Sequence, residues 1–404
     1  MTARTLAVVG AGLAGAKAAE AARDAGYEGR VVLIGDEGSP PYERPPLSKA
    51  VLRGEDAPSS AHVHPDGFYV GADIEIIHED VTEIDVAGRR VSLRGGDQIA
   101  FDSAVLATGA SPRRLTAPGA DLEGVHYLRT LEDALALQDA IKSSGRVAVV
   151  GAGWIGSEVA ASARQMGAEV VLIDPAPVPL HRVVGDVIGD VFGRLHADNG
   201  VRLRLGVGVH ALRGSSRVSE VVLDDGTTEA ADVVVVGIGV TPRTEVAERA
   251  GLRVDNGVIV NHYLETTAGG IYAVGDVANA WHPRYRRHVR VEHWANALNQ
   301  GVAAGQNIAR PRQAYDRLPY FFSDQYDLGM EYVGLGSPAD RLVVRGDLDA
   351  REFVAFWHRG GVVTAAMHVN VWGVVDDLKA IVSANRPVEI ARLADERVAL
   401  SEAA

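Results

Sequence analysis

The sequence feature that most constrains this chain is a glycine motif that occurs twice, each time after an apolar run and before an alanine-rich stretch. The two copies read Leu6-Ala-Val-Val-Gly10-Ala-Gly12-Leu13-Ala14-Gly15 and Arg146-Val-Ala-Val-Val-Gly151-Ala-Gly153-Trp-Ile155-Gly156. Glycines at this spacing let backbone amides at a helix N-terminus approach a pyrophosphate. The copies are too far apart for a solenoid repeat. They predict an α/β protein with two Rossmann-like dinucleotide-binding domains.

Each copy has a matching segment further along the chain. The first is Phe101-Asp-Ser-Ala-Val-Leu-Ala107-Thr108-Gly109, and the second is Ala231-Asp-Val-Val-Val-Val-Gly237-Ile238-Gly239. Both are runs rich in apolar, β-branched residues that stop at glycine, as buried parallel strands do. We expect these strand ends to line the two nucleotide sites.

Composition excludes several other classes of protein. The chain has 404 residues, no cysteine and a formal net charge of −13. The lack of cysteine removes disulfide scaffolds, Cys-ligated metal centres and thiol nucleophiles, so no metal site is expected. The acidic balance argues against a nucleic-acid or anionic-membrane binder. No apolar run is long enough to span a bilayer, and the first glycine motif is unlike a signal peptide, so the expected location is the cytoplasm.

An acid after the second glycine motif bears on the choice of nucleotide. The apolar run Val170–Ile173 ends at Asp174, 18 residues past Gly156. A carboxylate there accepts hydrogen bonds from both ribose hydroxyls and repels a 2′-phosphate, so we expect NADH rather than NADPH. The alternative is a structural glycine turn followed by an incidental surface acid.

The first copy departs from this pattern. Its strand Val31–Ile34 is followed by Gly35, Asp36 and Glu37, so glycine occupies the position that Asp174 holds in the second copy. We expect Asp36 or Glu37 to reach the ribose. The alternative is that both are solvated loop acids.

Two dinucleotide sites in one chain indicate two cofactors of different chemistry. A nicotinamide needs a hydride acceptor, and in a protein without thiols or metal clusters that acceptor is usually a flavin. The segment Ile271-Tyr-Ala-Val-Gly275-Asp276 reads as a strand that ends in Gly-Asp before a helix. A carboxylate there can bind a hydroxyl of the ribityl chain, so we expect FAD at one site and NADH at the other.

The rest of the chain predicts a third domain. Leu342–Arg345, Glu352–His358 and Val362–Val371 look like strands, with Gly360-Gly361 as a hairpin turn, and Asp376–Ser383 and Val388–Ala394 look helical. The expected domains are an FAD-binding domain over 1–112 and 245–322, an NADH-binding domain over 113–244, and a small α+β C-terminal domain over 323–404.

Taken together, the motifs resemble one family over essentially the whole chain. They are the two glycine loops, Arg44-Pro45-Pro-Leu-Ser-Lys49, Ala107-Thr-Gly109, Leu128-Arg-Thr130, Ile271–Ala278, Glu292-His-Trp294 and Phe322-Ser-Asp-Gln-Tyr326. The family is the FAD-dependent NADH:ferredoxin reductases that serve bacterial cytochrome P450 systems and Rieske-type dioxygenases. The resemblance implies a glutathione-reductase-like pair of Rossmann-like domains plus the small C-terminal domain.

The resemblance also implies roles for single residues. Gly10–Gly15 would hold the FAD pyrophosphate, Asp36 its ribose and Asp276 the ribityl chain. The other residues matched to flavin or nicotinamide contacts are Arg44, Pro45, Lys49, Val81, Arg129, Glu292, His293 and Trp294. Glu158 matches a glutamate that pairs with Lys49 near the flavin, and this pair would orient the two rings rather than transfer protons. The alternative for Glu158 is an ordinary acid near a helix start.

The chain departs from the family in two places. Phe322 stands where the family usually has a tryptophan that lies over the flavin side near the proposed electron exit, which bears on partner docking or electron-transfer rate. Asn370-Val-Trp-Gly replaces a common Asn-Arg-Pro, so the identity of the partner is expected to vary with it.

The expected reaction is electron transfer from NADH through FAD to a [2Fe–2S] ferredoxin. Such ferredoxins are acidic, so docking on this acidic chain needs a local basic face, for which the candidates are Arg284, Arg287, Arg310 and Arg312. The alternative is that these are solvated or paired loop charges. Two other functions stay open: an NADH-dependent oxidase or quinone reductase, and a non-catalytic NADH-sensing flavoprotein. Monomer and homodimer are both compatible with the sequence.

Overall fold

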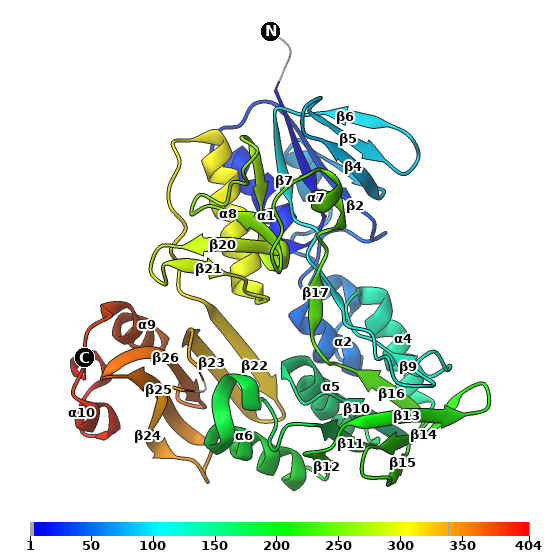
Figure 1. The fold of residues 1–404 in the computed structure, drawn as a ribbon, viewed down its shortest axis with the longest axis vertical. Helices are drawn as coiled ribbons and strands as arrows, with labels where there is room; N and C mark the ends of the chain where they lie inside the picture. The colour runs from blue at the N-terminus through cyan, green and yellow to red at the C-terminus, as the bar shows by residue number, and fades with distance from the viewer. Residues whose placement is uncertain (1–3, 338, 404) are drawn as a thin grey trace. The chain divides into compact units, whose positions relative to one another are not determined.

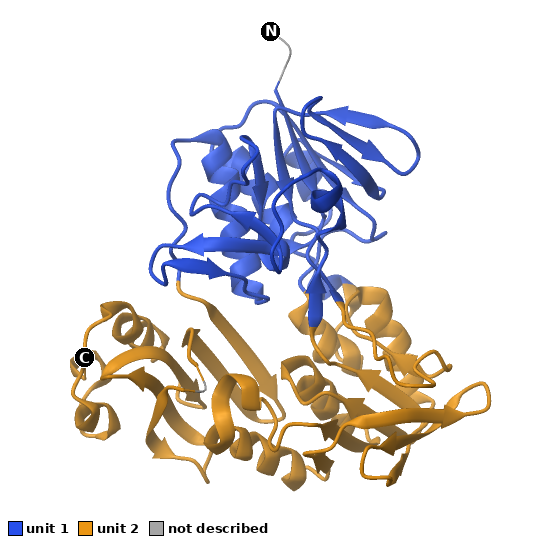
Figure 2. Cartoon of the chain, in the orientation of Figure 1, with its two compact units in different colours: residues 1–43, 59–111, 240–317 blue, residues 44–58, 112–239, 318–404 orange. Residues whose placement is uncertain are grey.

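The computed structural model describes residues 4–337 and 339–403. The chain divides into two compact units, coloured separately in Figure 2. Unit 1 comprises residues 1–43, 59–111 and 240–317, and unit 2 comprises residues 44–58, 112–239 and 318–404. Each unit contains one of the two glycine motifs.

Unit 1 is built on a five-stranded parallel sheet in the order β19-β7-β1-β2-β3 (Figure 1). Its strands are β1 (Thr5–Val9), β2 (Arg30–Gly35), β3 (Ile74–His78), β7 (Ser103–Leu106) and β19 (Ile271–Ala273). β1 lies between β2 and β7 and is almost wholly buried, which explains its continuous apolar run. The glycine motif follows its carboxyl end, where α/β sheets bind ligands.

Two helices of unit 1, α1 (Leu13–Asp24) and α8 (Trp294–Ala309), pack unusually closely. A Cβ on Gly301 of α8 would lie 2.4 Å from the Ala14 carbonyl oxygen, and one on Gly305 would lie 2.3 Å from that of Ala18. Only glycine therefore fits at these two positions. The contact fixes the start of α8 against the first glycine loop.

The remaining elements of unit 1 are short. They include the antiparallel sheet β4 (Val81–Asp85), β5 (Arg90–Leu93) and β6 (Gln98–Ala100) and the sheet β18 (Val258–Val260), β20 (Ala278–His282) and β21 (Arg287–Val289). Strand β17 (Val240–Pro242) pairs with β8 (Ala110–Pro112). The short helices are α3 (Phe68–Gly71), α7 (Glu245–Arg249) and the 3₁₀ turns η2 (Pro58–Ala61) and η3 (Gly275–Val277).

Unit 2 repeats the parallel sheet of unit 1, in the order β12-β11-β10-β16-β9. The strands of this sheet are β9 (Val125–His126), β10 (Arg146–Val150), β11 (Glu169–Asp174), β12 (Arg202–Leu205) and β16 (Val233–Val236). The helices that alternate with them in sequence are α4 (Leu131–Lys142), α5 (Trp154–Gln165) and α6 (His181–Asp198). A small antiparallel sheet is formed by β13 (Val209–Gly214), β14 (Val218–Leu223) and β15 (Thr228–Ala230). The prediction of two Rossmann-like domains is confirmed.

The chain beyond residue 318 forms a five-stranded antiparallel sheet in the order β22-β23-β26-β25-β24. Its elements are β22 (Tyr320–Gln325), β23 (Leu328–Gly334), β24 (Arg341–Asp347), β25 (Glu352–Arg359), β26 (Val362–Val369), α9 (Val375–Ala384), α10 (Ile390–Ala394) and η4 (Leu400–Glu402). The predicted α+β character is confirmed. Gly360 and Gly361 both have positive φ, as the predicted turn between β25 and β26 requires.

One face of this antiparallel sheet packs on α6. The buried cluster there combines Val184, Ile188, Val191, Phe192 and Leu195 of the helix with Phe321, Met330, Tyr332 and Phe353 of the strands. Segment 44–58, which holds η1 (Pro45–Ser48) and α2 (Ala50–Arg53), also belongs to unit 2, where Leu52 packs into the core around β10. Because η1, α2 and β22 all contact α5, three separate stretches of sequence meet around this helix.

Candidate functional site

The first glycine loop joins β1 to α1. A Cβ on Gly10, whose φ is 110°, would lie 2.2 Å from the Ala107 carbonyl oxygen, and one on Gly15 would lie 1.9 Å from that of Gly10. A Cβ on Gly12 would meet no described atom within 4 Å, and no side chain caps α1. Backbone atoms thus pack against Gly10 and Gly15, whereas the space next to Gly12 and the amides of the first helical turn is free. This arrangement fits a pyrophosphate.

The second glycine loop, between β10 and α5, has the same geometry. Gly151 has a φ of 105° and its Cβ would lie 2.3 Å from the Gly237 carbonyl oxygen, while a Cβ on Gly156 would lie 1.9 Å from that of Gly151. Around Gly153 the described structure again leaves 4 Å of free space, and α5 has no side-chain cap. Both loops therefore fit the pyrophosphate of a dinucleotide.

Two apolar side chains stand exposed beside the second loop. Ile155 is 48% exposed in the first turn of α5, and Ile238, just after β16, is 38% exposed. The strand before each is almost fully buried. A planar ring bound at this edge would remove both side chains from water, which is consistent with a nicotinamide nucleotide at the loop.

Asp174 lies at the end of β11 and closes the second loop. Its Oδ2 accepts a hydrogen bond from the Ala152 amide at 2.7 Å, and its Oδ1 accepts one from the Ala176 amide at 2.8 Å. Each carboxylate oxygen has a second lone pair, so acceptor capacity for ribose hydroxyls remains. The carboxylate thus both braces the glycine loop and presents negative charge beside it.

The corresponding position in unit 1, Gly35, has no room for a side chain because a Cβ there would lie 2.5 Å from the Ala11 Cβ. Asp36, one residue on, forms a 3.0 Å ion pair with Arg243. Burial raises the pKa of Asp36, but the charge and hydrogen bond of Arg243, together with further hydrogen bonds to the carboxylate, outweigh this, so the net pKa lies below the usual value. Glu37 accepts a hydrogen bond from the Tyr42 hydroxyl. The ribose role of Asp36 and Glu37 stays a prediction.

Other predicted flavin contacts of unit 1 gather at the first loop. A Cβ on Gly275, in η3, would lie 3.0 Å from the Ala14 Cβ, which brings Asp276 to the start of α1. Burial lowers the pKa of His293 to about 4, against a smaller opposing effect of the Asp276 carboxylate. His293 is therefore neutral at neutral pH, directly before α8.

The remaining predicted contacts of unit 1 are placed as follows. Thr108 donates a 2.7 Å hydrogen bond to the Arg243 carbonyl, and the carbonyl of Gly109 accepts one from the Arg243 amide. Glu292 pairs with Arg290 at 2.6 Å. Val81 begins β4, and Trp294 begins α8.

In unit 2 the structure brings Lys49 and Glu158 together. The Lys49 ammonium lies 2.8 Å from Glu158 Oε2 and 5.6 Å from the centre of the Phe322 ring. Arg44, directly before Pro45, donates a hydrogen bond to the Arg129 carbonyl. Glu158 lies in the second turn of α5 and is only 4% exposed, so it is not a solvated acid at a helix start.

Sequence reasoning missed three residues that contact predicted site residues, and a fourth, Trp154, that contacts the neighbour of Phe322. Ser48 and Ser323 hydrogen-bond the Glu158 carboxylate, Arg243 pairs with Asp36, and Trp154 of the second loop contacts the Phe321 ring at 4.9 Å between centroids. Both serines stand inside motifs that the sequence made conspicuous. Nothing in the sequence indicated that residues so far apart converge on one carboxylate.

The four arginines proposed for docking differ in their partners. Arg310 donates to the carbonyls of Asp24 and Ala25, and Arg312 forms two hydrogen bonds with Glu265, at 2.6 and 2.9 Å. Arg284 is half-buried, and Arg287 is exposed at the start of β21. The charge of Arg312 is thus largely compensated, whereas that of Arg287 faces solvent.

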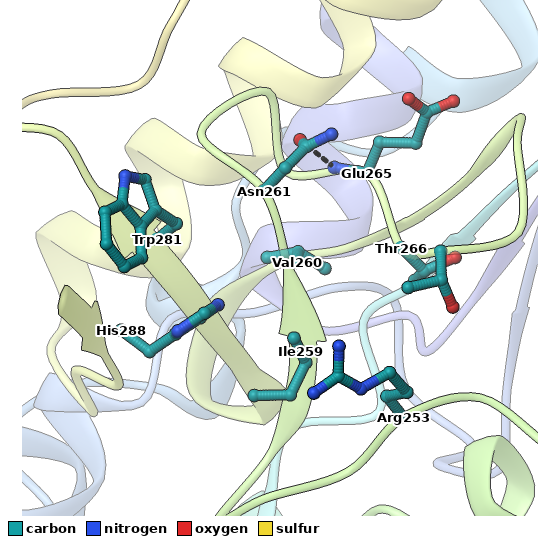
Figure 3. A pocket seen from close by; sticks show the side chains of 9 residues that line it. Arg253, Ile259, Val260, Asn261, Glu265, Thr266, Trp281 and His288 are labelled. Carbon is teal, nitrogen blue, oxygen red and sulfur yellow. Dashed lines mark hydrogen bonds between the residues drawn. The ribbon is translucent and has the colours of Figure 1, made fainter.

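A separate groove of about 360 Å³ lies on unit 1, at the sheet of β18, β20 and β21. Figure 3 shows Trp281 and His288 on one side, Arg253 on the other and Ile259 between them. None of the predicted cofactor residues lines it. It is therefore distinct from the glycine loops.

Comparisons with known proteins agree with this geometry. Residues 4–301 match the family described as pyridine nucleotide-disulphide oxidoreductase, and residues 320–404 match the reductase C-terminal family. The chain is 37% identical to putidaredoxin reductase of Pseudomonas putida, covering 98% of this chain and 95% of that protein. It is 38% identical to the ferredoxin–NAD(+) reductase component of the anthranilate 1,2-dioxygenase system of Burkholderia cepacia, covering 99% of each.

A solved structure gives the same result. The covalent putidaredoxin reductase–putidaredoxin complex matches with a TM-score of 0.94 and 36% identity, over 99% of this chain and 97% of the matched one. The chain belongs to the pyridine nucleotide-disulphide oxidoreductase family, in its ferredoxin reductase branch, and its cofactors are FAD and NAD(H). Unlike the disulfide reductases that give the family its name, it has no cysteine. No helix among residues 4–337 and 339–403 has the length and apolarity to cross a bilayer.

Proposed function

We propose that this chain transfers electrons from NADH, through bound FAD, to a [2Fe–2S] ferredoxin that supplies a P450 or Rieske-type oxygenase. The observation that carries the proposal is the pair of equivalent, uncapped glycine loops in a chain without cysteine. Bound FAD accepts a hydride and releases single electrons, which is chemistry that no side chain here can supply. The protein's own contribution is to bind, orient and shield.

We assign the first loop to FAD and the second to NADH. Gly10–Gly15, Asp36, Asp276 and the segment from Glu292 to Trp294 would hold the flavin nucleotide, and Gly151–Gly156, Asp174 and Ile238 the nicotinamide nucleotide. The assignment is supported by the Gly275–Asp276 turn, which lies against α1. Lys49 and Glu158 would fix the position of the bound nicotinamide.

The domain boundaries follow from the same assignment. We place the FAD-binding domain at 1–112 and 245–322, the NADH-binding domain at 113–244 and the C-terminal domain at 323–404. Within the first range, segment 44–58 packs in unit 2. Support for a boundary near residue 320 comes from the two family matches, which end at 301 and begin at 320. The cytoplasmic location stays a prediction.

The experiment that tests the function is NADH-driven cytochrome c reduction by the purified flavoprotein, with and without added [2Fe–2S] ferredoxins of P450 and Rieske systems. A large rate gain with one ferredoxin supports the proposal and identifies the class of partner. Rapid flavin reduction by NADH without a gain from any ferredoxin would instead favour an oxidase, a quinone reductase or a sensor.

Coenzyme preference gives a prediction at Asp174. The carboxylate beside the second loop repels a 2′-phosphate, so we expect kcat/KM for NADH to exceed that for NADPH by at least about tenfold. Asp174→Asn keeps an acceptor oxygen for the Ala152 amide but removes the charge. It should lower the ratio of kcat/KM for NADH to that for NADPH about tenfold. Asp225→Asn, an exposed acid of the same unit, serves as the control. Equal turnover of the wild type with both coenzymes would disprove the assignment.

The candidate docking arginines give a second prediction. Arg312 compensates a Glu265 carboxylate that is only 8% exposed, so Arg312→Ala should lower the free energy of unfolding by about 1–3 kcal/mol. Arg287→Ala removes an exposed charge and should leave stability within about 0.5 kcal/mol while weakening the salt dependence of ferredoxin reduction. Urea unfolding and turnover at two ionic strengths distinguish the two. If Arg287→Ala lost stability and Arg312→Ala did not, the structural role would belong to Arg287 instead of Arg312.

A further inference from the structure

The Glu158 carboxylate is a nearly fully buried charged group beside the second glycine loop. Its Oε1 accepts a hydrogen bond from the Ser323 hydroxyl at 2.7 Å, and its Oε2 accepts one from the Ser48 hydroxyl at 2.5 Å. The Lys49 ammonium lies 2.8 Å from the same Oε2. The three donors come from two distant segments of sequence, residues 48–49 and residue 323, and all lie within unit 2.

This arrangement has an electrostatic reason. A carboxylate that is 4% exposed loses nearly all its hydration, and a single counter-charge does not by itself repay that loss. Hydrogen bonds to both oxygens replace part of the lost hydration. Because Glu158 lies in the second turn of α5, the free amides at the helix start are not its donors.

Ser48 is itself held from two sides. Its hydroxyl donates to Glu158, and its carbonyl accepts a 2.6 Å hydrogen bond from the Ser162 hydroxyl, one helical turn further along α5. Ser48 is 1% exposed. The two contacts attach the segment Pro45–Lys49 to α5 and fix where the Lys49 side chain begins.

Ser323 connects the same carboxylate to the C-terminal sheet. It lies on β22 and is 1% exposed, and the two residues before it also contact the surroundings of Glu158. Phe321 packs against Trp154 of the second glycine loop, and the Phe322 ring lies 5.6 Å from the Lys49 ammonium. Three consecutive residues of β22, Phe321 to Ser323, therefore contact Trp154 at the glycine loop, Lys49 and Glu158 in turn.

We infer that Ser48 and Ser323 are positioning residues of the NADH-oxidising site. They hold the Glu158 carboxylate in one orientation, and through it fix the Lys49 ammonium. The C-terminal domain thereby takes part in the reaction of the nucleotide, through the Ser323 hydroxyl. This inference rests on the proposed function, in which Lys49 and Glu158 act on the bound nicotinamide.

The test compares variants of the FAD-loaded enzyme by stopped-flow reduction with NADH. Ser323→Ala should lower the limiting rate of flavin reduction about tenfold, the effect of one hydrogen bond to a charged group, with the apparent Kd for NADH unchanged. Ser323→Thr retains a hydroxyl and should restore the rate to within about twofold. Ser157→Ala is the matched control, because its hydroxyl is also buried in α5 but has no hydrogen-bond partner among the described residues.

Two further measurements separate a positioning role from a merely structural one. In a Glu158→Gln background, Ser323→Ala should change the rate less than about twofold, because the serine acts through the carboxylate. The midpoint potential of the bound flavin, measured by dye equilibration, should move in the same direction in Ser323→Ala and Glu158→Gln. Ser48→Ala provides the second variant, which removes the donor to the other oxygen if Ser323→Ala does not fold.

The outcomes that overturn the inference are specific. In one such outcome, Glu158→Gln is impaired, but Ser323→Ala and Ser48→Ala keep the wild-type rate of flavin reduction and the wild-type flavin potential. This result would show that the serines do not position Lys49 and Glu158. An equal loss with and without Glu158 would show that they do not act through it. If Glu158→Gln reduced its flavin at the wild-type rate, the inference would fail. The proposed reaction would still hold if the same preparations carried out NADH-driven ferredoxin reduction.

Discussion

Gly12→Ala is expected to yield a folded protein that has lost most of its affinity for FAD. A Cβ at Gly12 meets no described atom within 4 Å, and the backbone there, with φ −81° and ψ −173°, is open to any L-residue. The methyl group therefore costs the protein little by itself. It occupies the space above the amides of α1, where a pyrophosphate has to approach, and overpacking of this size costs about 1–3 kcal/mol. We expect the FAD Kd to rise about 10–100-fold.

The measurement is flavin content after purification, followed by titration of the apoprotein with FAD. Gly269→Ala is the matched control, because its Cβ also meets no described atom within 4 Å in unit 1 and it lies in no glycine motif. It should bind FAD as the wild type does. An unaltered FAD affinity in Gly12→Ala would remove FAD from the first loop, and a loss of native structure would mean that the space over Gly12 is not free.

Gly153→Ala is expected to separate the two cofactors. Gly153 has the same open environment as Gly12 and an equally permissive backbone, with φ −77° and ψ −175°, but it belongs to the second loop. The variant should purify with FAD bound and with its flavin absorption intact. Its apparent Kd for NADH should rise about 10–100-fold, by the same overlap of a methyl group with a bound pyrophosphate.

Stopped-flow reduction over a range of NADH concentrations measures this effect, and chemical reduction with dithionite checks that the flavin itself remains competent. Gly145→Ala, just before β10, is the control in the same unit, because its Cβ also meets no described atom within 4 Å. Loss of FAD from Gly153→Ala would mean that the two loops were assigned in reverse order. Wild-type reduction kinetics would mean that the second loop does not bind NADH.

The sequence was sufficient for the fold class because its signals are local. A buried strand, a glycine turn and a helix follow one another within about twenty residues, and each step has a backbone reason that holds in any protein. The structure accordingly places Gly10 and Gly151 in the same left-handed conformation and packs each against a carbonyl of a neighbouring strand end. The resemblance of the motifs identified the family, which the comparisons confirm.

The sequence by itself thus determined two dinucleotide loops, the family and the absence of thiol chemistry. Only the tertiary structure decided what surrounds each charged group, since that depends on residues far apart in the chain. Arg312 and Arg287 look alike in sequence, yet one is paired with a buried glutamate and the other faces solvent. Glu158 resembles an ordinary helix-start acid until folding places Ser48, Lys49 and Ser323 around it. A buried charge takes its properties from its donors, and the chain order does not reveal them.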